Sequence, residues 1–252
     1  MSFTCLTPIY VHGHYVPCGK CGYCLQKRSL EWQFRLTQEA KEWNTTSFIT
    51  LTYSPEFEPE NGVDKDTIQK FLKRLRKQGV KFKYYATSEY GPNGTHRPHY
   101  HIMFFHDLMP EAFYEHVEKA WPFGIISIGD INANRVAYCA NYHISKAWNP
   151  DKKNPNFCIM SKKLGAGFLT ESRVDFYQST GTMFVKHYDG YRLPMPRYFK
   201  KSLIFSPEHI RAMKEKVDSQ SLISDSSLYS LLKCEERLNK LLDKKLKKRS
   251  HI

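Results

Sequence analysis

The sequence of 252 residues lacks long hydrophobic runs, internal repeats and a secretion signal. No apolar stretch approaches the roughly 20 residues that a helix needs to cross a bilayer, so we expect no membrane partner. The N-terminus, MSFTCLTPIY, has no basic region followed by an apolar one, which argues against a signal peptide and for the cytoplasm. The absence of repeats argues against solenoid and propeller architectures.

Acidic residues are also scarce relative to basic ones. Asp and Glu number 25 against 38 Lys and Arg, which gives a formal net charge of +13. Such an excess favours a polyanionic partner, and nucleic acid is the commonest one because Lys and Arg neutralise its phosphates. Charge alone leaves a merely basic surface open as an alternative. The hydrophobic content of 41% is sufficient for a folded core.

The seven cysteines are unevenly placed, with four of them in the first 24 residues. An odd count without a secretion signal argues against a disulfide framework. Cys5, Cys18, Cys21 and Cys24 form a set suited to a structural Zn²⁺ ion. An iron–sulfur cluster and four unconnected thiols remain open as alternatives.

The hydrophobic periodicity predicts an α+β fold. Helical spacing of apolar residues predicts a helix over 25–43. The elements that follow have the order strand, helix, strand, strand, helix, strand, which is the ferredoxin-like split βαβ pattern. We expect a four- to five-stranded antiparallel sheet with both of these helices on one face, and the other face left for a site or another element. The six elements are predicted over 47–53, 64–79, 80–89, 99–105, 110–121 and 124–130.

Composition divides the chain into four parts. We expect a Cys-rich zinc-binding lobe over 1–25 and the α+β core over 26–150. Residues 151–205 predict a basic, irregular extension with short strands packed on the core. Leucines at helical spacing before a run of Lys and Arg predict a helical, basic tail over 206–252.

The strongest chemical signal is a hairpin that carries two histidines and a carboxylate. If its loop is centred on Gly94, antiparallel pairing places Glu89 opposite His99 and Thr87 opposite His101. Residues two apart in a strand share a face, so both imidazoles and the carboxylate converge. The set predicts a divalent cation site with open positions for substrate oxygens, although the same ligands also occur in non-haem iron oxygenases.

A second signal lies in the helix predicted over 134–148. Tyr138, Tyr142 and Lys146 are successive i, i+4 neighbours and therefore form one stripe. Two core aromatics with a lysine at the edge would give the same pattern. Beside a metal site in a basic chain, however, a tyrosine can act as the nucleophile at a phosphodiester, leaving a free 3′-hydroxyl and a 5′-phosphotyrosyl ester. The metal would polarise the phosphate, and Lys146 would steady it or lower the pKa of the phenol.

These segments together resemble the replication initiation proteins of the microviruses, which are small single-stranded DNA bacteriophages, within the HUH (His-hydrophobe-His) endonuclease superfamily. The resemblance covers roughly residues 5–200. It is carried by Pro17-Cys-Gly-Lys-Cys-Gly-Tyr-Cys24, Phe48-Ile-Thr-Leu-Thr-Tyr53, Ser88-Glu-Tyr-Gly91, Arg97-Pro-His-Tyr-His101, the helix with Tyr138, Tyr142 and Lys146, and Ser161-Lys-Lys-Leu-Gly-Ala-Gly167.

The resemblance implies rolling-circle replication: an enzyme that nicks an origin in single-stranded viral DNA, holds the 5′ end covalently and rejoins ends into circles. It implies His99, His101 and Glu89 as ligands of Mg²⁺ or Mn²⁺, and Tyr138 and Tyr142 as nucleophiles. Lys146 lies four residues after Tyr142, where many members have three, which weakens its catalytic assignment. The chain has no helicase-type phosphate loop, so a host helicase and polymerase in the bacterial cytoplasm are expected partners.

Basic residues on the predicted active face and in the matching motifs are expected to contact the DNA backbone, and Tyr85 is expected to stack on bases. The predicted backbone contacts are Lys81, Lys83, Arg97, Lys162 and Lys163. The rival interpretation is a non-enzymatic, zinc-stabilised DNA-binding protein in which the histidines and tyrosines are structural.

Overall fold

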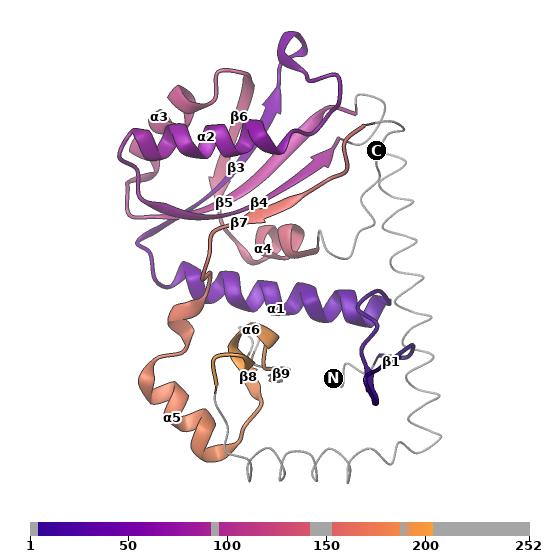
Figure 1. Cartoon of the computed structure of the whole chain (residues 1–252). Coiled ribbons are helices and arrows are strands. Elements are labelled where there is room, and N and C mark those ends of the chain that lie inside the picture. Colours follow the sequence, from indigo (N-terminus) through magenta and orange to yellow (C-terminus); the bar gives the residue numbers. More distant parts are fainter. Residues whose placement is uncertain (1–4, 92–95, 142–152, 187–189, 191, 204–252) are drawn as a thin grey trace.

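A five-stranded antiparallel sheet forms the centre of the protein (Figure 1). The computed structural model describes residues 5–91, 96–141, 153–186, 190 and 192–203. The strand order is β6-β3-β5-β4-β7. The strands span β3 Thr45–Tyr53, β4 Phe82–Tyr90, β5 Pro98–His106, β6 Gly124–Asp130 and β7 Cys158–Met160.

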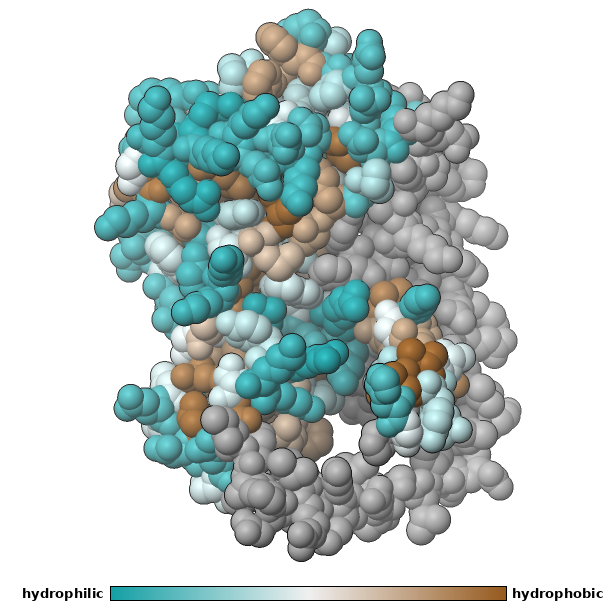
Figure 2. All heavy atoms as spheres, in the orientation of Figure 1, coloured by the Kyte–Doolittle hydropathy of each residue, from teal (hydrophilic) through white to brown (hydrophobic). Residues whose placement is uncertain are grey.

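Two helices cover one face of this sheet, α2 (Lys65–Lys77) and α3 (Pro110–Ala120). α2 begins at Asp64, whose carboxylate accepts hydrogen bonds from the backbone N–H groups of Asp66 and Thr67. Its apolar stripe is fully buried against the strands, while its outer surface is hydrophilic (Figure 2). The element order β3-α2-β4-β5-α3-β6 with sheet order β6-β3-β5-β4 confirms the predicted split βαβ core.

The other face of the sheet is covered as well, by α1 (Gly22–Ala40) and α4 (Ala133–Ala140) (Figure 1). Trp32 of α1 packs on Tyr85 of β4, with ring centroids 5.0 Å apart. Tyr85 is therefore 0% exposed, and the prediction that it stacks on DNA bases is wrong. The alternating pattern of β4 predicted the side of the sheet for Tyr85 but could not show that α1 folds over it.

α1 begins earlier than predicted and also ends earlier. Its first residue, Gly22, lies inside the cysteine motif, so Cys24 is in the first helical turn. At the other end the helix stops at Ala40, and the Trp43 indole N–H donates back to Glu39 Oε1 at 2.7 Å. The helix thus crosses the boundary expected near residue 25, and the division of the chain into four parts stays a prediction.

A small lobe lies on the far side of α1 from the sheet (Figure 1). Its core is built around Phe34 of α1, which contacts Phe168 and Phe199 edge-on. The segment predicted to be irregular thus contains regular elements, and β7 extends the sheet from it. The elements of the lobe are η3 Ala166–Phe168, α5 Glu171–Thr180, β8 Phe184–Lys186, β9 Arg192–Pro194 and α6 Arg197–Lys200.

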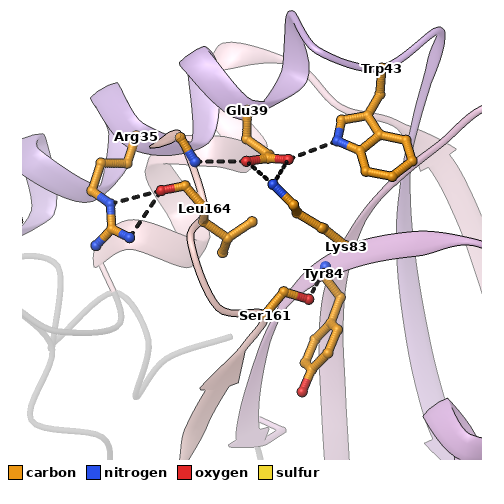
Figure 3. A network of polar contacts seen from close by, with 8 residues as sticks. Arg35, Glu39, Trp43, Lys83, Tyr84, Ser161 and Leu164 are labelled. Atoms are coloured by element: carbon orange, nitrogen blue, oxygen red, sulfur yellow. Dashed lines mark hydrogen bonds and ion pairs between the residues drawn. The ribbon is translucent and has the colours of Figure 1, made fainter. Parts of the chain in front are cut away.

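A buried carboxylate joins α1, the sheet and this lobe (Figure 3). Glu39 is 0% exposed, and Lys83 Nζ of β4 lies 2.7 Å from its Oε1. The backbone N–H of Gly165 donates to its Oε2 at 2.7 Å. One turn earlier, Arg35 donates through Nε and Nη2 to the carbonyl of Leu164 at 3.1 and 3.0 Å. The 161–167 motif is thus fixed to α1 by paired and fully hydrogen-bonded charges.

The helix predicted over 206–252 lies outside the described residues. Within the part of the chain that the structure describes, every helix is too short or too polar to span a bilayer.

Candidate active site

The β4–β5 hairpin has the register that the sequence predicted. Glu89 pairs with His99 and Thr87 pairs with His101. Glu89, His99 and His101 therefore share the face that carries α1 and α4, at the end of the sheet beyond α1. The side chains of His101 and Glu89 are 13% and 27% exposed, so the group is shielded but reachable.

Two threonines of β3 orient the histidines. Thr50 pairs with His101 and Thr52 with His99 across the β3–β5 ladder. The hydroxyl of Thr50 lies 3.0 Å from His101 Nδ1, and that of Thr52 lies 2.8 Å from His99 Nδ1. A hydroxyl that accepts from Nδ1–H leaves the lone pair on Nε2, which is the tautomer a metal ligand needs. Sequence reasoning placed both threonines on this face but gave them no role, because the β3–β5 register was unknown.

Gly91 forms part of the wall of the site. A Cβ added at this position would lie 2.7 Å from His99 Nε2. The backbone N–H of Gly91 donates to the carbonyl of Arg97 at 3.0 Å, which extends the hairpin past the last strand pair. Only glycine lets the chain pass so close to the imidazole. The sequence signal was the Gly91 that closes the Ser-Glu-Tyr-Gly segment.

The carboxylate and the imidazoles are close together. His101 Nε2 lies 2.9 Å from Glu89 Oε1. Burial, and next the neighbouring His101, lower the pKa of His99, which favours the neutral, ligand-competent imidazole. The two Nε2 atoms and the Glu89 carboxylate can thus serve a divalent cation. Within the described residues, however, the cysteine cluster is the one group whose ligand atoms are already gathered tightly around a common point.

Tyr138 brings a phenol to the same place. Its hydroxyl donates to Glu89 Oε1 and Oε2, at 2.6 and 2.7 Å. Its ring stands edge-on to His101, with centroids 5.3 Å apart. Although it is an aromatic residue next to a core, Tyr138 is 38% exposed. The structure therefore brings together four residues that the sequence singled out: Glu89, His99, His101 and Tyr138.

The position of Tyr138 follows from how α4 is anchored. Asn132 caps the helix by accepting from the N–H of Arg135 at 2.9 Å. Val136 and Cys139 are buried against α1 and the sheet. At the other end, Ser29 of α1 donates to Asn141 Oδ1 at 2.8 Å. With its buried face and both ends fixed, α4 turns Tyr138 towards Glu89. Tyr142 and Lys146, the other members of the predicted stripe, lie outside the described residues.

The predicted DNA contacts are not all near this site. Lys83 is paired with the buried Glu39 and lies six residues along β4 from Glu89, about 20 Å at about 3.3 Å per residue. Its ammonium is thus committed to the structural network of Figure 3, and we no longer expect it to contact DNA. Lys81 is exposed but lies still further along the same line. Arg97 directly precedes β5 at the histidine end, and its charge contributes to lowering the pKa of His99.

Lys162 and Lys163 are exposed in the turn after β7. Lys163 has φ of 59°, an unusual conformation for a residue with a side chain. The turn is held to β4 by a hydrogen bond from the N–H of Ser161 to the carbonyl of Tyr84 at 2.9 Å. Both ammonium groups remain available to solvent and anions.

The four N-terminal cysteines come together as predicted. Their sulfur atoms all lie within 4.8 Å of one another, and the four thiols are not joined by disulfides. The Cys5–Cys21 and Cys18–Cys24 sulfur pairs are 3.8 and 3.9 Å apart. A tetrahedral Zn²⁺ ion with bonds of about 2.3 Å places its sulfurs about 3.8 Å apart, so the donor set fits one such ion.

Backbone amides support this cluster. The N–H groups of Lys20 and Cys21 donate to Cys18 Sγ at 3.4 and 3.3 Å, and the Thr7 hydroxyl donates at 3.3 Å. These donors, led by Thr7, lower the pKa of Cys18 to about 5, whereas burial raises the pKa of Cys24 to about 12. The hairpin of β1 (Ile9–Val11) and β2 (His14–Val16), between Cys5 and Cys18, carries exposed apolar side chains and is visible as a hydrophobic patch in Figure 2.

Comparison with known proteins agrees with the motifs. Residues 46–147 match the model of a family of replication-associated proteins that is named after ORF2. The replication-associated protein ORF2 of Spiroplasma virus 4 is 28% identical over 84% of this chain and 77% of its own length. ORF4 of Chlamydia phage 1 is 26% identical over 87% of this chain and 63% of its own length. VP4 of Bdellovibrio phage phiMH2K is 24% identical over 73% and 66%.

The family match extends from β3 past α4, and it therefore contains the histidines, Glu89 and Tyr138. The similarity to the phage proteins extends well beyond that segment. The resemblance to replication proteins of microvirus-like phages is thereby confirmed, and residues 46–147 belong to the ORF2 family of replication-associated proteins. No solved structure matches the chain.

Proposed function

We propose that this protein initiates replication of a single-stranded phage genome by nicking DNA through Tyr138 or Tyr142 and rejoining the ends. The names of its relatives support a role in replication. The observation that carries the nicking proposal is the position of Tyr138: its phenol lies 2.6–2.7 Å from Glu89 and its ring contacts His101. A structural tyrosine has no need to be aimed at a metal-ligating set.

The chemistry is a transesterification. The phenol oxygen attacks the scissile phosphorus, the bond from phosphorus to the 3′ oxygen breaks, and that oxygen leaves as a 3′-hydroxyl after taking a proton. Glu89 accepts the hydrogen bond of the Tyr138 phenol, so the carboxylate is the group placed to hold or receive its proton. The number of phosphoester bonds is unchanged, which allows the reverse reaction to join ends without ATP.

His99, His101 and Glu89 fit a Mg²⁺ or Mn²⁺ ion, because two oriented imidazoles and a carboxylate leave positions for phosphate oxygens. When bound, the cation would polarise the scissile phosphate and offset its developing charge. Thr50 and Thr52 fix the imidazoles, and the close approach of Gly91 confines His99.

The cysteine cluster is proposed to hold a structural zinc ion. In an iron–sulfur cluster each cysteine reaches a different iron, which would spread the sulfurs more widely than 3.8–3.9 Å. The ion would join the β1–β2 hairpin to the start of α1, a segment with few core residues of its own.

The proposal is tested with labelled single-stranded viral origin DNA in the presence of Mg²⁺ or Mn²⁺. A nickase yields a shortened 3′-hydroxyl product and a protein–DNA adduct on the 5′ end that survives denaturant. A non-enzymatic DNA-binding protein yields only a salt-sensitive mobility shift, and that result would refute the proposal.

Single variants assign the roles. His101→Ala is expected to abolish cleavage and leave DNA binding largely intact, since the imidazole would act on the metal. Tyr138→Phe and Tyr142→Phe, tested singly and together, separate the two nucleophiles. An undiminished adduct in the double variant would end the tyrosine mechanism. Unwinding and synthesis would fall to a helicase and a polymerase of the bacterial host, in whose cytoplasm the protein would act.

A further inference from the structure

A cavity lies between α1 and α6, in the small lobe and away from the hairpin that carries the histidines. Its volume is about 440 Å³, within the usual range of ligand sites. One wall is a stripe of α1 at helical spacing, and the other is α6 with the residue that follows it. Figure 1 shows α6 directly against α1.

The cavity is strongly basic. Arg28, Arg35, Arg197 and Lys201 line it, and Glu31 is the one acid among the lining residues. Arg28, Arg197 and Lys201 are exposed, and no carboxylate of the described residues lies within 4.0 Å of their charged groups.

Further positive charge surrounds the one acid. Burial raises the pKa of Glu31, while Lys27, Lys200 and Arg28 act against that rise. Burial, and next Lys27, lower the pKa of Lys200. Four cations in the lining and two more beside it thus face a single, partly desolvated carboxylate. Such an excess of one sign in a concave surface concentrates anions.

Aromatic rings form the rest of the wall. Arg35 lies between Trp32 and Tyr198, with its guanidinium carbon 4.2 and 3.8 Å from the two ring centroids. Its Nε and Nη2 are fixed by the carbonyl of Leu164. The wall is therefore ordered before any ligand arrives, which lowers the entropy cost of binding.

We propose that this cavity binds a segment of single-stranded DNA, with backbone phosphates on Arg28, Arg197 and Lys201 and a base against the Trp32–Arg35–Tyr198 stack. Exposed cations beside an ordered aromatic and guanidinium surface are the combination that sequence-independent single-strand binding uses. The inference goes beyond the proposed nicking reaction, because it assigns a second DNA contact on α1 and α6. There it would hold the strand whether or not cleavage occurs.

The test measures binding of a fluorescent 20-nucleotide oligothymidylate by anisotropy over a range of salt concentrations. The variant R28A/R197A/K201A removes three exposed charges. It is expected to weaken binding about tenfold or more and to reduce the salt slope by about 2, since each phosphate contact contributes about 0.7. The matched control K70A/K73A/K77A removes three exposed charges from α2 and should change both quantities little. Circular dichroism checks that both variants fold.

A second arm identifies the contact and the ligand. An oligonucleotide carrying 5-iodouracil is expected to crosslink to the peptide containing Trp32 or Tyr198 on irradiation. Equal losses in the two triple variants, or crosslinks confined to other peptides, would overturn the proposal. So would thymidine monophosphate binding as tightly as the oligonucleotide, because the ligand would then be a free nucleotide.

The proposed cavity and the proposed reaction fail separately. Cleavage in wild-type protein together with unchanged binding by R28A/R197A/K201A would refute the cavity alone. Absence of cleavage together with lost binding in that variant would refute the nicking reaction alone.

Discussion

The two threonine hydroxyls behind the histidines are the most direct handle on the proposed catalytic metal site. Thr50→Val and Thr52→Val keep the shape and β-branching of each side chain and remove only the oxygen that lies 3.0 or 2.8 Å from an imidazole Nδ1. Without that acceptor each histidine can place its proton on Nε2 or rotate, and either change removes a lone pair from the metal.

The magnitude follows from the hydrogen bonds. One such bond contributes about 1 kcal/mol, so each single variant should weaken Mn²⁺ affinity about fivefold. The double variant should lose about 2 kcal/mol, or roughly 30-fold, which lies within the 10- to 100-fold typical of residues that orient metal ligands. Because Glu89 and Tyr138 are unaffected, the rate at saturating metal should change much less than the metal requirement.

The assay is the initial rate of oligonucleotide cleavage as a function of Mn²⁺ concentration, supported by calorimetric titration of Mn²⁺. Thr46→Val is the matched control, because Thr46 lies on the same face of β3 but pairs with Phe105 rather than with a histidine. If T50V/T52V has the same Mn²⁺ midpoint as the control, the threonines do not orient the ligands and the reasoning fails.

Four further perturbations test other parts of the structure. Gly91→Ala places a Cβ 2.7 Å from His99 Nε2 and should reduce cleavage at least about tenfold with little change in folding, measured by rate and by circular dichroism; a fully active variant would show that the ring can move aside freely. Lys83→Met leaves its carboxylate partner, which is 0% exposed, without a counter-ion and should lower the free energy of unfolding in urea by about 2–4 kcal/mol, whereas an unchanged midpoint would show that the buried pair contributes nothing. Burial lowers the pKa of His106 to about 4, so the unfolded chain takes up a proton that the folded protein does not; stability should therefore fall by up to about 3 kcal/mol as pH drops from about 6.5 to 4. The variant H106Q should lose that part of the pH dependence, and an identical pH profile would contradict the assignment. Removal of zinc by a chelator, or Cys24→Ser, should lower the melting temperature and release about one zinc per chain by elemental analysis, and finding neither zinc nor iron in purified protein would refute the metal assignment.

The sequence was informative wherever a local pattern had one physical solution. The alternation of β4 and β5 about a turn centred on Gly94 sets a single register, so the pairing of Glu89 with His99 followed from counting residues. The cysteine spacing likewise required a compact loop, and the four sulfurs are found together.

Contacts between distant segments could not be predicted in this way. Nothing local shows that Lys83 meets a carboxylate 44 residues earlier, so its charge looked available to DNA. Tyr85 looked exposed for the same reason, since the alternation of a strand gives two faces but not what covers each. The cavity between α1 and α6 brings Arg28 and Arg197 together from segments whose sequences carry no common motif.

The sequence by itself determined the split βαβ order, the hairpin with His99 and His101, and the candidate role of Tyr138, because periodicity and spacing act over a few residues. Only the tertiary structure decided that Thr50 and Thr52 hold the imidazoles, that α4 turns Tyr138 onto Glu89, and that α1 closes the second face of the sheet. Those arrangements depend on how β3, α1 and α4 pack against one another. That packing is set by the summed burial of many side chains rather than by any one segment.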